Sequence, residues 1–202
     1  MPQASLDELT THVSAGSHLA SFPTDTVPAL AAQPAQAALI YVAKQRSLDK
    51  PLILMAATMT DLWDYVKGTE TERHSWEKVA NRYLPGALTL VLPASDRVPP
   101  VMNPHHLTTI GVRVPDHAIA QAILAQTGAL ATTSANLSGQ PPLETISEIE
   151  AQFPTVLTLS PHESQRIAGQ VSLTASGIPS TVIRWNGGGW EVLRQGAVRL
   201  EL

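Results

Sequence analysis

Residues 132–139 read TTSANLSG and follow a short apolar stretch at 128–131. Small hydroxyl residues, an amide and a glycine therefore gather where a strand is expected to end. Such residues let the backbone turn tightly and expose N–H groups, and their side chains add hydrogen bonds around an anion. Open α/β sheets bind ligands at strand ends, so this turn is predicted to hold a phosphate. The alternative is a polar loop that caps the next helix.

Further motifs occur in a fixed order along the chain. They are PTDT at 23–26, Lys44-x-Arg46, Pro51-Leu52, Pro85-Gly86 with Thr89, Arg113-x-Pro115, Ser180-Thr181-Val182 and Leu193-Arg194 with Gly196. Together with the run at 132–139, this order resembles the YrdC-like threonylcarbamoyl-adenylate synthases over residues 15–198. The agreement of all motifs in register carries the resemblance, since each motif alone is weak.

The resemblance implies an α/β (α+β) fold, a twisted mixed sheet with helices on its faces, in a single domain over 1–202. It implies that L-threonine, bicarbonate and ATP give threonylcarbamoyl-adenylate and pyrophosphate, for N6-threonylcarbamoyladenosine formation in tRNA. Mg²⁺ is expected to arrive with ATP, and threonylcarbamoyl-transferase proteins are the expected downstream partners. Such a reaction needs anions brought together and their charge neutralised.

The resemblance also implies roles for individual residues. The catalytic group is Lys44, Arg46, Lys50 and Ser134; the threonine-binding group is Thr24, Arg113, Thr132 and Ser180; the nucleotide-binding group is Arg46, Lys50, Thr109, Ser134, Asn136, Pro142 and Arg194. No residue is expected to bind a metal directly. The adjacent pair His105-His106 is not expected to form a metal site, because neighbouring side chains diverge.

The residue types agree with these roles but leave simpler alternatives. Arg46 can bind phosphate oxygens in a fork, while Lys44 and Lys50 supply point charges; a solvated basic helix end is the alternative. Arg113 should point away from its two valine neighbours on a strand and reach into a cleft, or else form a surface ion pair. For Thr24 the alternative is a turn residue whose hydroxyl caps its own backbone, and Asp25 is expected to have a structural role.

The chain departs from the family pattern at three places. Pro28-Ala29 replaces a tyrosine and a glycine, Met55 replaces a histidine, and 159–177 lacks an aspartate-glycine signature. Met55 is expected only as part of a pocket wall. The stretch 159–179 is predicted to be irregular, either a mobile lid or a surface loop. The alternatives for function are an RNA-binding or ribosome-assembly module of the same fold, and a paralogue with altered or lost amino-acid specificity.

Composition narrows these alternatives. The chain has 202 residues, 44% of them hydrophobic, a formal net charge of −4 and no cysteine. Disulfides and thiolate zinc sites are therefore excluded, and binding of long RNA by charge alone is disfavoured. The first residues lack the pattern of a signal peptide, and no apolar run reaches the length of a membrane span, so a cytoplasmic protein without a membrane contact is expected.

Periodicity and turn residues predict the elements. Helices are predicted at 5–14, with a capping box of Ser5 and Glu8, and at 35–46, 60–66, 71–83, 116–126 and 145–152; strands are predicted at 18–22, 52–57, 87–92, 108–114, 181–185 and 190–194, the last two joined as a hairpin.

Overall fold

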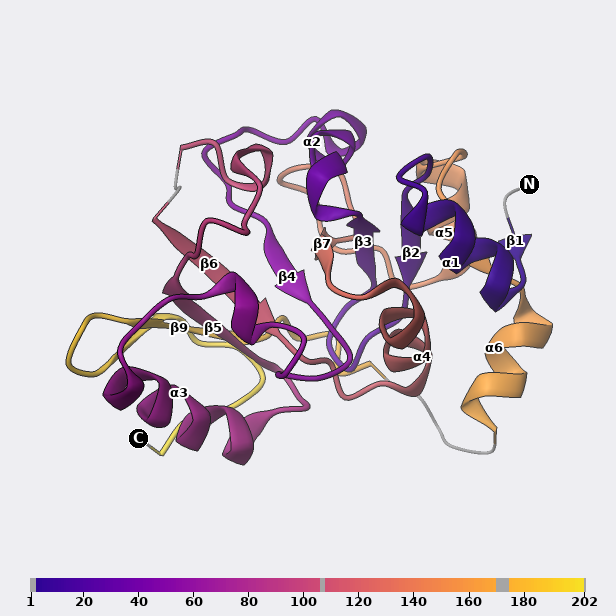
Figure 1. Ribbon diagram of the computed structural model, residues 1–202. Coiled ribbons are helices and arrows are strands. Elements are labelled where there is room, and N and C mark those ends of the chain that lie inside the picture. The colour runs from indigo at the N-terminus through magenta and orange to yellow at the C-terminus, as the bar shows by residue number, and fades with distance from the viewer. Residues whose placement is uncertain (1–2, 106–107, 170–174, 202) are drawn as a thin grey trace.

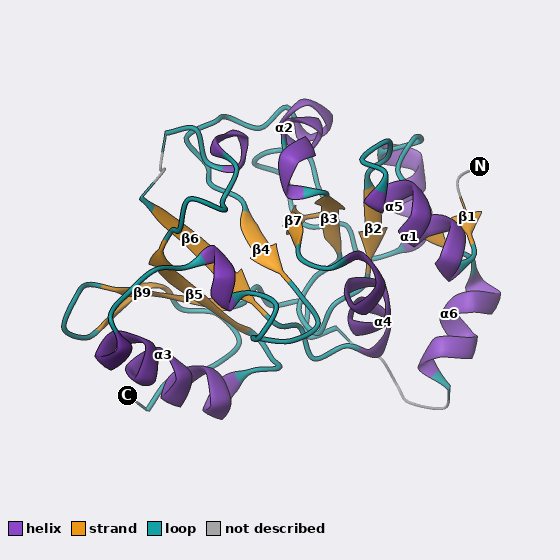
Figure 2. Ribbon diagram, in the orientation of Figure 1, coloured by secondary structure: helices purple, strands orange, loops and turns teal. Residues whose placement is uncertain are grey.

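The computed structural model describes residues 3–105, 108–169 and 175–201, and its centre is a mixed eight-stranded sheet (Figures 1 and 2). The strand order is β10-β9-β5-β6-β4-β7-β3-β2. The pairs β9/β5 and β6/β4 are parallel and the others are antiparallel. The strands are β2 (Ala20–Phe22), β3 (Ala29–Ala32), β4 (Ile53–Met55), β5 (Leu88–Pro93), β6 (Thr109–Arg113), β7 (Leu130–Ser134), β9 (Thr181–Trp185) and β10 (Trp190–Arg194). The predicted mixed sheet is confirmed.

In the described part of the chain, six α-helices and a small second sheet lie around this centre. The helices are α1 (Leu6–Ser14), α2 (Ala38–Lys44), α3 (Glu70–Tyr83), α4 (Ala118–Thr127), α5 (Ile146–Gln152) and α6 (Pro161–Ala168), with 3₁₀ turns at Pro34–Gln36, Trp63–Tyr65 and Pro100–Met102. The strands β1 (Gln3–Ala4) and β8 (Thr158–Leu159) form the second, parallel sheet. The predicted capping box of Ser5 and Glu8 is present at the start of α1, and it satisfies backbone N–H groups that a helix start leaves unpaired.

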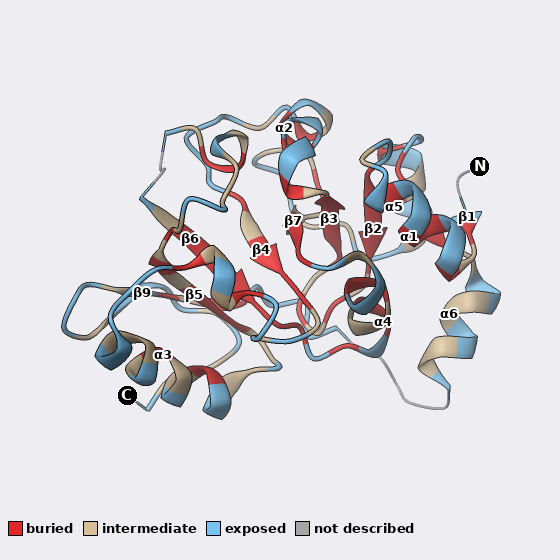
Figure 3. Ribbon diagram, viewed as in Figure 1, coloured by how far each residue is buried: buried red, intermediate tan, exposed pale blue. Residues whose placement is uncertain are grey.

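Alternation along the strands divides the apolar side chains between two cores. Leu30 of β3 belongs to the same core as Trp76 of α3. Its neighbour Ala31 belongs to the other core, with Leu9 of α1 and Ile123 of α4. The two faces of β3 therefore contribute to different cores, and helices cover it from both sides. Figure 3 shows the buried strands between helices whose outer surfaces are exposed.

Two helix predictions need correction. The helix predicted over 60–66 is only the 3₁₀ turn Trp63–Tyr65. The helix predicted over 35–46 is a 3₁₀ turn followed by α2, which ends at Lys44. Gln45 takes a left-handed conformation, with φ of 50°, and Arg46 N–H then bonds to the carbonyl of Tyr41 at 2.9 Å. This closes the helix, so Arg46 lies beyond it rather than in its last turn.

The stretch 159–179 is also more regular than predicted. It contains the end of β8 and the helix α6, which contacts α4. Ser160 caps α6 and Pro161 begins it, a combination that favours helix starts. Residues 170–174 of the predicted lid lie outside the described residues. Beyond them, the backbone N–H groups of Ser176 and Gly177 bond to the carbonyls of Asp25 and Thr26, both at 3.0 Å.

Gly196 lets the C-terminal segment cross the start of β9 closely. An added Cβ there would lie 2.2 Å from the carbonyl oxygen of Pro179 and 2.5 Å from the Ser180 backbone. Rigid backbone atoms cannot yield as a flexible side chain can. The space between these two segments is therefore limited to a residue without a side chain.

We predict that Gly196→Ala lowers the free energy of unfolding by about 1–3 kcal/mol, because the new methyl group must displace backbone. Gly188→Ala is the matched control, since an added Cβ meets nothing within 4 Å there, and it should change stability by less than about 0.5 kcal/mol. Urea denaturation measures both. Equal stability of the two variants would contradict the close crossing.

Candidate active site

A cavity of about 500 Å³ lies on one face of the large sheet. Thr89 and Val91 of β5 line it, whereas Leu88, Leu90 and Leu92 point to the opposite face and belong to the core. The same alternation holds along β4, β6 and β9, whereas consecutive residues of β7 and β10 line the cavity. Lining residues from the strands include Ile53 and Met55 of β4, Thr109, Gly111 and Arg113 of β6, Thr132 and Ser134 of β7, Val182 and Arg184 of β9, and Leu193 and Arg194 of β10. The site therefore extends across the sheet face rather than lying only at a strand end.

Four arginines line this cavity: Arg46, Arg113, Arg184 and Arg194. Within the described part of the chain, the lining contains no aspartate or glutamate. Arg113 and Arg184 are paired with carboxylates outside the lining, Asp25 at 2.6 Å and Glu191 at 2.7 Å, whereas the described residues show no ion pair for Arg46 or Arg194. Guanidinium groups bind carboxylates and phosphates with paired N–H donors. This arrangement is suited to more than one anionic group.

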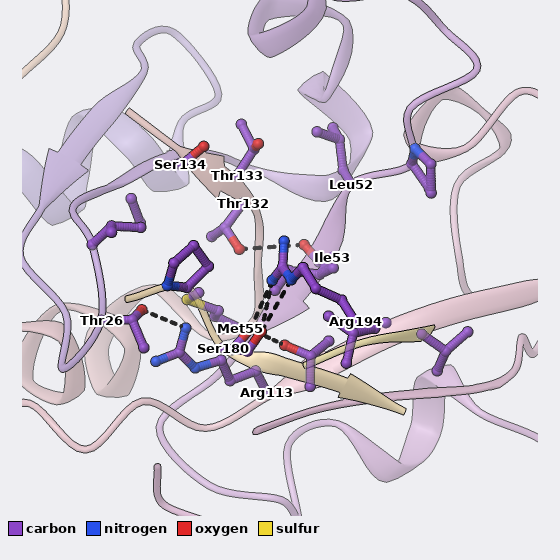
Figure 4. Close-up of a pocket in the computed structure, with 18 of the residues that line it drawn as sticks. Thr26, Leu52, Ile53, Met55, Arg113, Thr132, Thr133, Ser134, Ser180 and Arg194 are labelled. Atoms are coloured by element: carbon purple, nitrogen blue, oxygen red, sulfur yellow. Dashed lines mark hydrogen bonds between the residues drawn. The ribbon is translucent and has the colours of Figure 1, made fainter. Parts of the chain in front are cut away.

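Arg113 is almost fully buried, with 3% of its surface exposed. Its Nη2 bonds to Asp25 Oδ1 at 2.6 Å, its Nη1 to Thr26 Oγ1 at 2.9 Å and its Nε to the Gly86 carbonyl at 3.1 Å. Burial lowers the pKa of Arg113, and the Asp25 carboxylate opposes that effect. These partners fix the guanidinium at the cavity wall, and the expected alternation along β6 is observed (Figure 4).

Arg194 reaches the same cavity from β10 (Figure 4). Its Nε and Nη2 bond to the Ser180 carbonyl at 3.2 and 2.8 Å. The Ser180 hydroxyl in turn lies 2.9 Å from Thr89 Oγ1. Burial lowers the pKa of Arg194, and its charge also contributes to lowering the pKa of Arg113. Two cationic side chains thus face one space, which an anion between them would stabilise.

Thr24 and Thr26 make different contacts in the PTDT turn. Thr24 Oγ1 donates to the Val27 carbonyl at 2.7 Å and accepts from the Thr26 N–H at 3.2 Å. Both threonines are fully buried, but only Thr26 is part of the cavity lining, where its Oγ1 accepts from Arg113 Nη1. The geometry therefore favours Thr24 as the residue that holds the turn and Thr26 as the one that presents its side chain.

Lys44 holds the turn that follows β7. Its ammonium group donates to the carbonyls of Ser134 and Asn136 and to Asn136 Oδ1, the last at 3.2 Å. The side chain is fully buried, and burial lowers its pKa to about 7, with further lowering by Arg46 and Lys50. Lys44 does not line the cavity. Its position favours support of the turn over contact with a ligand.

The side chain of Asn136 forms hydrogen bonds within the same turn. Its amide nitrogen donates to the carbonyls of Leu137 and Gln140 at 2.8 and 2.7 Å. Its Oδ1 accepts from the Ser134 hydroxyl at 2.5 Å. Ser134 lines the cavity, but Asn136 does not. The turn thus presents Ser134 and its backbone, and Asn136 fixes their shape.

The structure brings eight of the sequence-derived site residues together around the cavity and places four outside its lining. Those in the lining are Arg46, Thr109, Arg113, Thr132, Ser134, Pro142, Ser180 and Arg194; those outside are Thr24, Lys44, Lys50 and Asn136. Lys50 is exposed and its Nζ lies 3.3 Å from Ser138 Oγ. Arg46 donates to the carbonyls of Lys50 and Pro51 at 2.9 and 3.1 Å. These two bonds curl residues 46–51 into a loop at the cavity edge.

Sequence reasoning missed several lining residues. They include Thr26, Ile53, Thr89, Asn103, Thr133 and Arg184. Period-two alternation offered a signal for some of them, since Arg184 lies two residues beyond Val182 and Ile53 two before Met55. Met55 lines the cavity as expected for a wall residue. Asn103 gives no such signal, because it lies in a loop and its Oδ1 accepts from the Leu52 N–H at 2.7 Å.

Metal-binding residues do not gather at this cavity. Across 3–105, 108–169 and 175–201, no three of histidine, cysteine, aspartate and glutamate lie close enough to hold a metal ion. His105 Nδ1 instead lies 2.6 Å from Asp49 Oδ1, and His106 lies outside the described residues.

The helices of the described chain are also too short or too polar to cross a membrane.

Comparison with known proteins identifies relatives of this chain. The family model of Sua5, YciO and YrdC, described as telomere recombination, matches residues 14–196. A threonylcarbamoyl-AMP synthase of Escherichia coli O1:K1 is 36% identical over 152 residues, which cover 71% of this chain and 77% of that protein.

Solved structures show the same fold. Sua5 of P. abyssi in complex with L-threonine has a TM-score of 0.81 and 31% identity and covers 95% of this chain, which spans 54% of that longer chain. E. coli YciO has a TM-score of 0.75 at 23% identity, with 95% of this chain and 88% of that chain covered, and it supports the fold alone. The family match over nearly the whole sequence, together with these likenesses, shows that the chain belongs to the Sua5/YciO/YrdC family.

Proposed function

We propose that the protein is an L-threonylcarbamoyladenylate synthase, which converts L-threonine, bicarbonate and ATP into threonylcarbamoyl-AMP and pyrophosphate. The observation that carries this proposal is the cavity whose described lining has four arginines and no carboxylate. All three substrates are anionic or carry an anionic group. The similar synthase of E. coli and the threonine complex of P. abyssi Sua5 support the choice of substrates.

The reaction requires positioning and charge neutralisation more than covalent help from the protein. The amine of threonine adds to bicarbonate to give a carbamate, with loss of water. A carbamate oxygen then attacks the α-phosphorus of ATP, and the bond to the β-phosphate oxygen breaks, so pyrophosphate leaves with the electron pair. Cationic donors fixed in advance stabilise the charge that develops on the phosphoryl oxygens.

We assign the residues as follows. Arg113 binds the threonine carboxylate, because Asp25 and Thr26 already hold its guanidinium at the cavity wall. Thr132 and Ser180 line the same side. Thr109, Ser134, Pro142, Arg46 and Arg194 line the nucleotide side. Proteins usually hold Mg²⁺ through carboxylates together with substrate phosphates, and the described lining has no carboxylate, so Mg²⁺ would be held by the ATP phosphates and would offset their charge.

The positions of Lys44, Lys50, Thr24 and Asn136 refine their roles. Lys44, Thr24 and Asn136 act through the two turns that they hold, and Lys50 lies at the edge of the cavity where it can meet the outer phosphates. Transfer to tRNA by separate threonylcarbamoyl-transferase proteins and a cytoplasmic location follow from the same proposal. Direct RNA binding is the competing function, and it would give no pyrophosphate release from ATP.

We predict that the purified protein releases pyrophosphate from ATP only when threonine and bicarbonate are both present. A coupled pyrophosphate assay, with each substrate omitted in turn, measures this, and mass spectrometry of the product identifies the adenylate. Release that does not depend on threonine would reject the proposed amino-acid substrate. No release under any condition would favour the RNA-binding function or an inactive paralogue.

Arg46→Ala should weaken ATP binding by about tenfold to a hundredfold, because it removes a charge-assisted contact to phosphate. Threonine affinity should change little, since Arg113 binds that carboxylate. The matched control is Arg97→Ala, whose side chain pairs with Asp64 at the surface. Calorimetric titration gives both affinities, and an unchanged ATP affinity in folded Arg46→Ala would contradict the assignment.

Lys44→Met should lower the free energy of unfolding by about 2–4 kcal/mol, because the Ser134 and Asn136 carbonyls lose a buried donor. Pyrophosphate release should fall with it, since the turn that presents Ser134 is no longer fixed. Lys67→Met, an exposed residue paired with Asp96, should stay within about 0.5 kcal/mol of the parent. If Lys44→Met kept full stability and lost only turnover, Lys44 would have to contact substrate directly.

A further inference from the structure

A second cavity, of about 220 Å³, lies behind the PTDT turn and apart from the arginines. Its walls come from the end of β2, the start of α4, the helix α5 and the short strand β8. Phe22, Pro28, Ile119, Ile149 and Leu159 make most of it apolar. A cavity walled mainly by apolar groups favours an apolar occupant over bulk water.

His117 is the unusual member of this wall. It is 3% exposed, and within the described residues neither Nδ1 nor Nε2 has a hydrogen-bond partner. Two other polar side chains of the wall are already paired: Ser21 Oγ donates to the Ala29 carbonyl at 2.8 Å, and Thr158 Oγ1 donates to Glu150 Oε1 at 2.9 Å. A buried polar group without a partner costs free energy, which a bound polar group in the adjoining space would recover.

The charge around His117 limits what could bind. Burial lowers the pKa of its imidazole, and Asp25 and Asp116 oppose this effect. A neutral ring offers one donor and one acceptor. Among the described residues of the wall, Glu144, which is exposed, is the only ionisable side chain besides His117, and none is a lysine or arginine. An anionic ligand would therefore find no cation to pair with.

We propose that this second cavity is a small-molecule site for a compact, mainly apolar, uncharged compound whose hydroxyl or amide group hydrogen-bonds to His117. The proposal does not depend on the synthase activity. Pro28 lines both cavities. An occupant of the second cavity would therefore contact Pro28, which lies two residues after Thr26 of the first cavity. The site is thus placed to influence the amino-acid side of the larger cavity.

Phenol tests the proposal, because it joins an apolar ring to one hydroxyl group, and toluene is its counterpart without the hydroxyl. The full chain, with ¹⁵N-labelled histidine, is titrated with each compound and followed by the imidazole ¹⁵N resonances. We expect saturable phenol binding that shifts the His117 nitrogens and is about fivefold to tenfold tighter than toluene binding, the difference made by one hydrogen bond. Absence of a saturable shift at His117 would overturn the proposal and leave water as the occupant.

Variants separate the pocket from the rest of the surface. His117→Leu should bind phenol no better than toluene, while His74→Leu, a change at an exposed position of α3, should keep the preference. A second pair does not depend on removing the buried histidine. Ser164→Trp, from the cavity wall, should fill the space and abolish binding, whereas Ser147→Trp on the exposed side of α5 should not. Phenol binding that survives Ser164→Trp would place the compound elsewhere and reject the site.

Discussion

The ion pair between Arg113 and Asp25 joins the parts of the molecule that form the larger cavity. Asp25 Oδ1 accepts from Arg113 Nη2 at 2.6 Å and from the backbone N–H of Asp116, at the start of α4, at 3.2 Å. The carbonyls of Asp25 and its neighbour accept from Ser176 and Gly177, just before β9. The PTDT turn, β6, α4 and the approach to β9 thus converge on one carboxylate and its backbone. A buried pair of this kind contributes little net stability, but loss of one partner leaves an uncompensated charge. Here the pair fixes the Arg113 guanidinium at the cavity wall, which the sheet alone would not do.

Much of the cavity follows from one property of strands, and this part could be predicted from sequence. Arg113 lies between two valines, so its side chain had to leave the apolar face, and the structure places it in the cavity while Val112 and Val114 join the core. The mixed sheet followed from helices alternating with strands and hairpins. The capping box of α1 followed from Ser5 and Glu8, a local signal that does not depend on tertiary contacts.

The rest depends on geometry that no local pattern records. Thr24 and Thr26 are the same residue type two positions apart, and only the shape of the turn decides which hydroxyl bonds to backbone and which faces the cavity. Lys44 and Arg46 point in different directions because the left-handed Gln45 ends α2 between them. The Lys44 ammonium therefore bonds to the loop after β7, whereas Arg46 lies at the edge of the cavity. The helix α6 was missed although Ser160 and Pro161 mark its start, because its sequence has too few apolar residues to show a helical period.

The departures from the family pattern affect cavity walls rather than the course of the backbone. Ala29 is paired with Phe22 of β2 and Ser134 of β7, and among the described residues Gln45 is the one non-glycine with positive φ. The freedom of a glycine is therefore not used at this position, and alanine fits the strand without strain. Pro28 has no N–H to donate, but its carbonyl accepts from Ala135 at 2.8 Å, which keeps β3 joined to the turn after β7. Because Pro28 forms part of both cavities, its replacement of a larger aromatic ring changes the space on each side of one wall. Met55, the other departure in the lining, also belongs to the wall of the larger cavity, so a difference in substrate choice between this chain and its relatives is expected at Pro28 and Met55.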